Sequence, residues 1–340
     1  MEDMSLYLLS LVCAAIITAA ALPILRKTTK NILKDTPTAV KDHKGIISTA
    51  GGTAVALGFF TSLTLVRFLT DFPTGTLRNL RGLFIGGAII YTLGIIDDIK
   101  KPKGLSPYLR LFFQALAACA LIHYGIYIQF TAQPLGYILT VLWVVGLTNA
   151  FNLIDIMDGL AVSQALLAAT AFAFISLPSE FIYVNFAACA LLGAALAFLP
   201  FNLSGKFKTF LGDGGSTLLG FLLAALSLGT SYSEVNPLAV YVPLLILALP
   251  VFNTLFVSAV RLSKGINPLH ATPDHYPLRL KKAGLNPCGI VTLSALVAIL
   301  LGCAALYITL SGPQAALRIY GFCTALFIIA AGILLTKKFS

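Results

Sequence analysis

The sequence predicts an all-α, polytopic membrane protein, a single integral-membrane domain over residues 1–340 that crosses the bilayer about 11 times. Hydrophobic residues make up 58% of the chain and charged residues only 11%, whereas soluble domains carry roughly 25% charged residues. The mean hydropathy of +0.91 leaves too little polar surface to cover a water-soluble globule of this size. The third observation is a series of separate apolar stretches, most of them near the roughly 20 residues that cross a bilayer as a helix.

These apolar stretches follow one another with polar connections between them, and each predicts a membrane helix. They lie near Ser5–Leu25, Thr49–Phe68, Leu83–Ile96, Leu111–Phe130, Leu135–Phe151, Leu160–Leu177, Phe181–Leu199, Ser216–Thr230, Leu238–Val260, Cys288–Thr309 and Ala315–Leu335. Glu2 and Asp3 precede the first stretch, where a secretory signal would carry Lys or Arg, so we expect a retained first span. The third and eighth stretches are short, and we expect each to be tilted, broken or completed by its flanking residues.

The distribution of Lys and Arg predicts which side each connection faces. With the N-terminus outside and the C-terminus cytoplasmic, all but four of the 23 basic residues fall on the cytoplasmic side. The predicted cytoplasmic loops lie near residues 26–48, 97–110, 149–160, 200–216 and 261–287. Such a basic rim attracts anionic lipid and phosphorylated solutes. No segment outside the spans is long enough to form a nucleic-acid-binding domain, so we expect no nucleic-acid partner.

Five of the 13 acidic residues lie where apolar stretches meet the predicted cytoplasmic side. They are Asp97, Asp98, Asp155, Asp158 and Asp213. A single such Asp can cap a helix or pair with a Lys, but a carboxylate at the bilayer centre costs about 2.5–3.5 kcal/mol, and less toward the interface. The adjacent Asp97 and Asp98 repel each other unless a cation lies between them. The sequence therefore predicts a Mg²⁺ site, with Mn²⁺ as an alternative, because Mg²⁺ binds through one or two carboxylates plus substrate phosphates.

Three further segments on that side carry polar side chains suited to a ligand. In residues 149–160, a continuous helix would place Asn152, Asp155 and Asp158 on one face, near Asn149. In residues 212–216, glycines allow backbone N–H groups to approach an anion, and we expect Ser216 to cap the following helix. The loop 261–287 contains two of the four histidines among basic residues, which is typical of a phosphate or nucleotide contact.

With these motifs the chain resembles the bacterial polyprenyl-phosphate N-acetylhexosamine-1-phosphate transferases, from about Lys41 to Pro287. The motifs are Lys44-Gly45 with Gly51-Gly52, Asp97-Asp98 with Arg110 and Gln114, residues 149–160, and Pro200-Phe201-Asn202 with residues 212–216. The predicted number of spans makes the chain look more like the branch that initiates antigen synthesis than like the phospho-MurNAc-pentapeptide translocases.

The resemblance implies a Mg²⁺-dependent enzyme whose active site lies at the cytoplasmic face of the bacterial inner membrane. It is also compatible with a homodimer. It implies transfer of a sugar-1-phosphate from a UDP-N-acetyl sugar to polyprenyl phosphate, with release of UMP, as the first step of a lipid-linked cell-envelope glycan such as O-antigen. The implied catalytic residues are Asp97, Asp98, Asp155 and Asp158, and the implied metal ligands are Asp213 and Asp155. The implied substrate-binding residues are Lys44, Asn149, Asn152, Asn202, His275 and Arg279.

The chain departs from the family pattern in two places, and both leave the donor sugar open. In the fifth loop only His275 matches a cluster of family histidines, since Pro277 and Leu278 stand at the later positions. In the first loop, residues 46–50 lack the proline and arginine that usually precede the glycine pair.

Three other interpretations of the aspartates remain. A cation-coupled transporter would use Asp97, Asp98 and Asp155 as ion sites, but it predicts carboxylates near mid-membrane rather than at span ends. An intramembrane prenyltransferase also binds Mg²⁺ through Asp-rich motifs, although with a spacing different from that of Asp155 and Asp158. A structural membrane scaffold would not concentrate aspartates in this way. For the transferase, direct attack by the lipid phosphate and a phospho-aspartate intermediate both fit the sequence.

Overall fold

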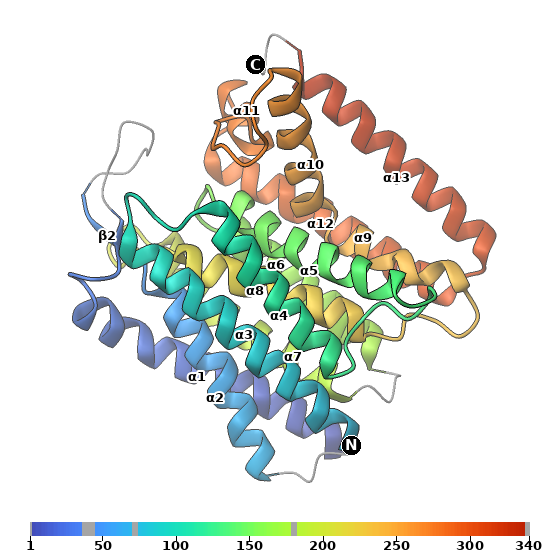
Figure 1. The fold of residues 1–340 in the computed structure, drawn as a ribbon, viewed down its shortest axis with the longest axis horizontal. Coiled ribbons are helices and arrows are strands. Elements are labelled where there is room, and N and C mark those ends of the chain that lie inside the picture. Colours follow the sequence, from blue (N-terminus) through green and yellow to red (C-terminus); the bar gives the residue numbers. More distant parts are fainter. Residues whose placement is uncertain (1, 36–44, 70–73, 178–181, 337–340) are drawn as a thin grey trace.

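The structure is a computed structural model, and it describes residues 2–35, 45–69, 74–177 and 182–336 (Figure 1). The described elements are α1 (Glu2–Thr28), β1 (Lys34–Asp35), β2 (Ile47–Ser48), α2 (Gly51–Leu69), α3 (Thr74–Lys100), α4 (Pro107–His123), α5 (Leu135–Ile154), α6 (Leu160–Ser176), α7 (Ile182–Leu203), α8 (Gly212–Gly229), η1 (Pro237–Tyr241), α9 (Val242–Ile246), α10 (Ala248–Ser263), α11 (Tyr276–Lys282), α12 (Pro287–Leu310) and α13 (Pro313–Leu334). The chain is thus nearly all-α, and the two short strands pair antiparallel with each other.

Every apolar stretch that the sequence marked contains helix. The third is completed by its flanking residues, as expected, and forms the middle of the 27-residue α3. The ninth differs from its prediction, because the chain bends by 71° between Pro237–Ile246 and Ala248–Ser263. Pro250 has no N–H to donate to the carbonyl of Ile246, and its ring would clash with that carbonyl in a continuous helix. The prediction of an unbroken helix from Leu238 to Val260 is therefore wrong.

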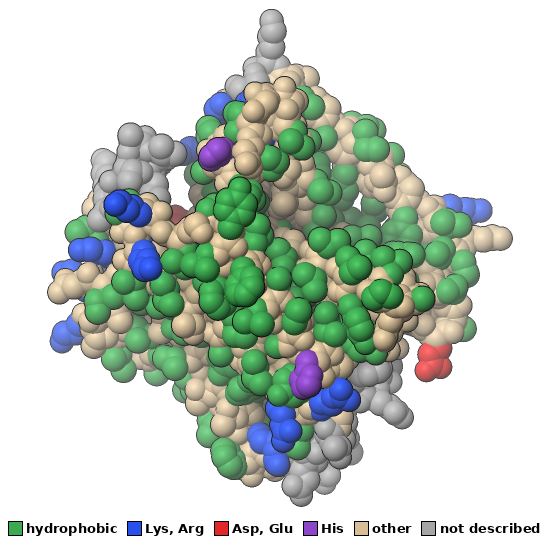
Figure 2. All heavy atoms as spheres, in the orientation of Figure 1, with side chains coloured by type: hydrophobic (Ala, Val, Ile, Leu, Met, Phe, Trp, Pro, Cys, Tyr) green, Lys and Arg blue, Asp and Glu red, His purple; other side chains and the backbone are tan. Residues whose placement is uncertain are grey.

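The described helices make this a multi-pass membrane protein. Seven of them are long and apolar enough to cross a bilayer, or eight if the bent pair counts as one span. The helices α4 and α6 are apolar but have only 17 residues each. Figure 2 shows hydrophobic side chains over the middle of one face and Lys and Arg toward its edges, as expected for a surface in lipid. The count of eleven crossings and the orientation of the termini remain predictions.

The helix α8 lies at the centre of the bundle. Its residues from Gly214 to Ser227 are all buried, and it packs against α2, α3, α5 and α6. A helix that is apolar on every side is stable only when other helices surround it. On the outside, α1 packs against α2 and α7, and α12 packs against α6 and α9. The first turn of α8 carries Asp213, so the acidic motif begins at the buried core of the molecule.

Glycines let the first turn of α8 fit between α2 and α3. A Cβ atom on Gly52 would lie 2.4 Å from the Cα of Gly215, and one on Gly94 would lie 2.4 Å from the Cα of Gly214. Real Cβ atoms do not approach backbone this closely, so the three helices can meet here only with glycine at the contact. This contact places Asp213 beside the C-terminal end of α3.

Connections between helices meet at one end of the bundle. Ser48 bridges to Thr209, the Gly159 N–H donates to Oδ1 of Asn202 at 2.6 Å, and Asn202 Nδ2 donates to the Thr209 carbonyl at 3.1 Å. The predicted loops that meet there lie near residues 26–48, 97–110, 149–160 and 200–216. Segments that the charge distribution assigned to one side of the membrane therefore do lie together.

Candidate active site

Asp98 holds the N-terminus of α8. Its Oδ1 accepts the N–H of Asp213 at 3.1 Å, and its Oδ2 accepts the N–H of Gly214 at 3.0 Å. The residue is only 3% exposed. A carboxylate here satisfies helix N–H groups that have no partner in their own helix and matches the positive end of the helix dipole. The prediction that Ser216 caps α8 is wrong, because α8 begins four residues earlier and Ser216 Oγ donates to the Gly212 carbonyl at 3.0 Å.

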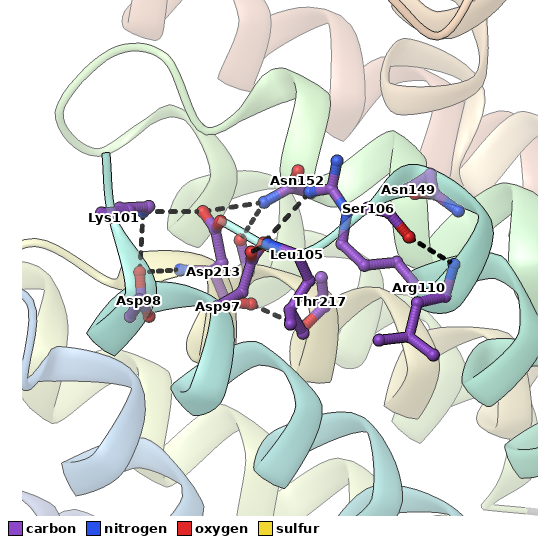
Figure 3. A network of polar contacts seen from close by, with 12 residues as sticks. Asp97, Asp98, Lys101, Leu105, Ser106, Arg110, Asn149, Asn152, Asp213 and Thr217 are labelled. Carbon is purple, nitrogen blue, oxygen red and sulfur yellow. Dashed lines mark hydrogen bonds and ion pairs between the residues drawn. The ribbon is translucent and has the colours of Figure 1, made fainter. Parts of the chain in front are cut away.

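Lys101 bridges two of the aspartates (Figure 3). Its Nζ donates to Asp98 Oδ1 at 2.7 Å and to Asp213 Oδ1 at 3.1 Å. Burial of the ammonium opposes its charge, but the charges of Asp213 and Asp98 outweigh this and raise the pKa of Lys101. Lys101 therefore stays protonated and supplies a cation between the carboxylates. The sequence analysis missed it, because a Lys at this position also fits the charge rule for cytoplasmic loops.

Asp97 points to different partners from its neighbour. Its carboxylate accepts the backbone N–H of Leu105 and pairs with Arg110 Nη1 at 3.2 Å. It also lines the same small cavity as the Asp213 carboxylate. Successive residues on a helix point about 100° apart, so Asp97 faces α4 and the space beside Asp213 while Asp98 faces the backbone of α8.

A cavity of about 10 Å³ lies beside Asp97 and Asp213, large enough for one water molecule or small ion. Its polar lining comes from α3, α4, α5 and α8 and consists of Asp97, Arg110, Gln114, Asn149, Asn152, Asp213 and Thr217. Asn152 Nδ2 donates to Asp213 Oδ1 at 3.3 Å and to Ser216 Oγ at 3.0 Å. Asn149 Nδ2 donates to Gln114 Oε1 at 2.6 Å. Both predicted amides therefore lie at the cavity, and Gln114 and Thr217 join them.

Asp155 and Asp158 do not share a helical face with Asn152. The helix α5 ends at Ile154, Asp155 has ψ 54°, and Gly159 has φ +79° before α6 begins. The half-buried Asp155 still lies near the cluster: loss of hydration and then the charge of Asp213 raise the pKa of Asp155 to about 7, while Lys101 opposes the shift. Asp158 forms an ion pair with Lys208 at 2.5 Å. The backbone of 149–160 is therefore not the continuous helix on which the shared face of Asn152, Asp155 and Asp158 depended.

The other predicted substrate-binding residues lie apart from the cavity. Asn202 is 3% exposed, and its amide is committed to the backbone of the neighbouring connections. Arg279 is 4% exposed and donates to Asp274 at 3.0 Å and to the Leu334 carbonyl at 2.8 Å. Lys44 lies outside the described residues.

His275 is also buried, at 6% exposure, and its Nδ1 lies 3.2 Å from Nδ2 of Asn253. Burial, followed by the charge of Arg261, lowers the pKa of His275 to about 4, so the ring is neutral at physiological pH. Among the described contacts, those of His275 and Arg279 tie the loop to α10 and α13, and none reaches the aspartates at the cavity.

Comparison with known proteins gives a consistent assignment. A model of glycosyl transferase family 4 matches residues 80–231, the part of the chain that carries all five aspartates. A probable undecaprenyl-phosphate N-acetylglucosaminyl 1-phosphate transferase of Bacillus subtilis (strain 168) is 30% identical over 309 residues, which cover 87% of this chain and 81% of that protein.

Two further relatives have similar names. The undecaprenyl-phosphate alpha-N-acetylglucosaminyl 1-phosphate transferase of Escherichia coli (strain K12) is 27% identical over 81% of this chain and 77% of its own length. The protein of that name from Salmonella typhi is 28% identical over 79% of this chain and 74% of its own length. The chain belongs to glycosyl transferase family 4.

Proposed function

We propose that this protein transfers N-acetylglucosamine 1-phosphate from a UDP-linked donor to undecaprenyl phosphate at the cytoplasmic face of the bacterial inner membrane. The observation that carries the proposal is the meeting of Asp97, Asp213 and Arg110 around a small cavity at one end of the helix bundle, with Lys101 paired to Asp213 beside it. A site at a bundle end is open to a water-soluble donor and to a lipid acceptor alike. The names of the relatives support the sugar and the lipid.

In the proposed reaction, an oxygen of the lipid phosphate attacks the phosphorus that carries the sugar. The bond from that phosphorus to the bridging oxygen breaks, and UMP leaves with the bridging oxygen. Both reactants are anions, so Lys101 and Arg110 assist by offsetting their mutual repulsion. Asp97 is the member of the aspartate pair that we assign to accept a proton from the lipid phosphate, since it lines the cavity.

The residues present fit a divalent cation such as Mg²⁺ or Mn²⁺. Asp97 and Asp213 both line a cavity of single-ion size. Among the described residues no three acidic, His or Cys side chains form a metal cage, but Mg²⁺ commonly takes one or two carboxylates and completes its shell with water and substrate phosphates. Asp213 would hold the ion, with Asp155 at the edge of the cluster, and the ion would offset phosphate charge when bound.

The described contacts give no support to the cation-transporter alternative. Its ion sites would be carboxylates near mid-membrane, whereas Asp97 and Asp98 lie in the last turn of α3, beyond its apolar part. The carboxylates also lie at an end of the bundle, where a phosphate substrate from the cytoplasm has access.

The test is to incubate the purified protein with undecaprenyl phosphate, Mg²⁺ and a panel of UDP-sugars, and to measure UMP and lipid-linked product. We expect turnover only with both substrates, fastest with UDP-N-acetylglucosamine, and none in excess chelator. Asp213→Asn should lower kcat roughly a hundredfold or more, whereas Glu234→Gln, in an exposed loop after α8, should not change it. Undiminished turnover by Asp213→Asn, or UMP formed without lipid, would contradict the proposal.

A further inference from the structure

A second cavity, of about 730 Å³, lies at the opposite end of the bundle. It is bounded by the first half of α5, the last turn of α8 with the residues that follow it, and η1 and α9. Asp213 opens α8 and Ser227 lies near its end, so the two cavities are about 20 Å apart along this helix at 1.5 Å per residue. Six aromatic residues line the second cavity, which we call the aromatic cavity: Tyr127, Phe130, Trp143, Tyr183, Tyr232 and Tyr241.

The lining of the aromatic cavity carries no formal charge. Among the described residues that form it there is no Asp, Glu, Lys, Arg or His, and the polar ones are amides, hydroxyls, the Trp143 indole N–H and backbone groups. A charged group placed among these side chains would lose its hydration with no opposite charge in the lining, which is strongly unfavourable. Arg78 lies near Gly125 but is not part of the lining, and it donates to the His123 carbonyl. The lining therefore favours an uncharged ligand of a size typical for small-molecule pockets.

One nearly buried hydroxyl of the aromatic cavity has no hydrogen-bond partner among the described residues. Tyr183 is only 2% exposed, and its hydroxyl makes no hydrogen bond with any described residue. The hydroxyl fits only because residue 229 is glycine, since a Cβ there would lie 1.5 Å from the oxygen. Nearby groups are paired: Trp143 Nε1 donates to Ser227 Oγ at 2.8 Å, and the Tyr232 hydroxyl donates to the Ser227 carbonyl at 2.5 Å. The oxygen is not one of the fully buried atoms that lack a partner, so it is accessible from the cavity, where a ligand carbonyl or hydroxyl can pair with it.

The rim of the aromatic cavity is apolar and exposed. Phe130, Leu142, Tyr241 and Leu244 line it and are between 42% and 63% exposed. Leu142 lies on α5, a helix long and apolar enough to cross the bilayer. A ligand that enters past these side chains comes from the hydrocarbon region and carries hydrocarbon chains.

From the uncharged lining, the unpaired hydroxyl and the apolar rim, we infer that the aromatic cavity binds an uncharged lipid of the diacylglycerol type. Its hydroxyl or ester carbonyl pairs with Tyr183, and its chains extend past Leu142 into the bilayer. This inference does not depend on the proposed transferase activity, because the two cavities share no residue.

The chain offers a direct probe, since Trp143 is its only tryptophan and lines the aromatic cavity. The purified protein in phosphatidylcholine nanodiscs is titrated with diacylglycerol carrying brominated chains, which quench indole fluorescence on contact. Brominated phosphatidylglycerol at the same mole fractions is the charged comparison. We expect saturable quenching by diacylglycerol and only a gradual, unsaturated decrease with phosphatidylglycerol.

Two variants and a matched control locate the site. Tyr183→Phe removes one oxygen and should raise the half-saturating mole fraction about three- to tenfold, the range for losing one hydrogen bond. Val240→Phe fills the cavity and should abolish the saturable phase. Tyr307→Phe, which alters an exposed residue of α12, should leave the curve unchanged.

Equal quenching by both lipids would overturn the inference, and so would a Tyr183→Phe curve that coincides with wild type. If Val240→Phe unfolds at a lower temperature than wild type, the Tyr183→Phe titration alone tests the inference, because this substitution adds no atom to the cavity.

Discussion

Asp97 and Asp98 are neighbours in the sequence with different partners, and we expect their replacement by Asn to have different effects. Asp98→Asn places an NH₂ group against the N–H groups of α8 or the Lys101 ammonium, and should destabilise the fold by about 1–3 kcal/mol. Asp97→Asn keeps an oxygen for the Leu105 N–H, so it should lower kcat with a smaller loss of stability. Thermal unfolding and UMP release, measured on both variants, test this. Equal stability losses would show that Asp98 does not hold α8.

His275 should give the protein a stability that depends on pH. Burial and Arg261 lower the pKa of His275 to about 4, with Asp274 opposing, whereas a His in an unfolded chain titrates near 6.5. Between these values the unfolded chain binds a proton that the native protein does not, so stability falls as the pH drops from about 6.5 to about 4. His275→Gln cannot titrate and should flatten the unfolding temperature across this window. His270→Gln, at an exposed position of the same loop, should leave the wild-type slope.

Single residues show what the sequence could and could not predict about the site. The aspartates were identifiable because carboxylates are rare at the ends of apolar segments. Their local roles were not: Asp98 caps a helix 115 residues away in the chain, and no local pattern signals such a cap. Ser216 had the right residue type for a cap, yet the glycines before it are already helical. Tyr183 gave no signal at all, since its unpaired hydroxyl appears only once α7 and α8 are packed.

At the scale of the helices, glycine contacts should decide whether α8 can reach α2. Gly52→Ala places a Cβ 2.4 Å from the Gly215 Cα, so we expect helix displacement, a stability loss of about 1–3 kcal/mol and at least a tenfold lower kcat. Gly146→Ala on α5 has nothing within 4 Å of its new Cβ. It should be neutral or slightly stabilising, because alanine favours helix. Thermal unfolding and kinetics of the pair test this, and an unaffected Gly52→Ala would contradict the contact.

The existence of the helices followed from composition, whereas their breaks did not. Each apolar stretch predicted helix correctly, because hydrocarbon-length apolar sequence has few other stable folds. The ends and bends depend on single residues within those stretches. Pro250 breaks the ninth stretch at Leu247, and the left-handed Gly159 ends the turn after α5. Both residues were visible, but an average over a long apolar window does not register them.

At the scale of the whole molecule, the two cavities lie at opposite ends of the same central helices. The helix α8 begins at the Asp cluster and ends at the aromatic cavity, and α5 runs between the same two regions. The first cavity is lined by charged groups and borders the connections rich in Lys and Arg, while the second has no charge and an apolar rim. The two ends of the molecule therefore differ in charge, and we expect the charged end to lie on the cytoplasmic side of the membrane.

The orientation is testable at two exposed loop positions, one at each end of the bundle. Gly205 lies in the α7–α8 connection, among predicted cytoplasmic residues, with nothing within 4 Å of a new Cβ, and Glu234 lies in the exposed connection after α8. In a variant whose six native cysteines are replaced by alanine, a membrane-impermeant maleimide should label Glu234→Cys in intact cells. Gly205→Cys should be labelled only after the membrane is permeabilised, because the excess of Lys and Arg keeps its end in the cytoplasm. The reverse pattern would place the Asp cluster outside, away from any cytoplasmic nucleotide donor, and would contradict both the orientation and the proposed reaction.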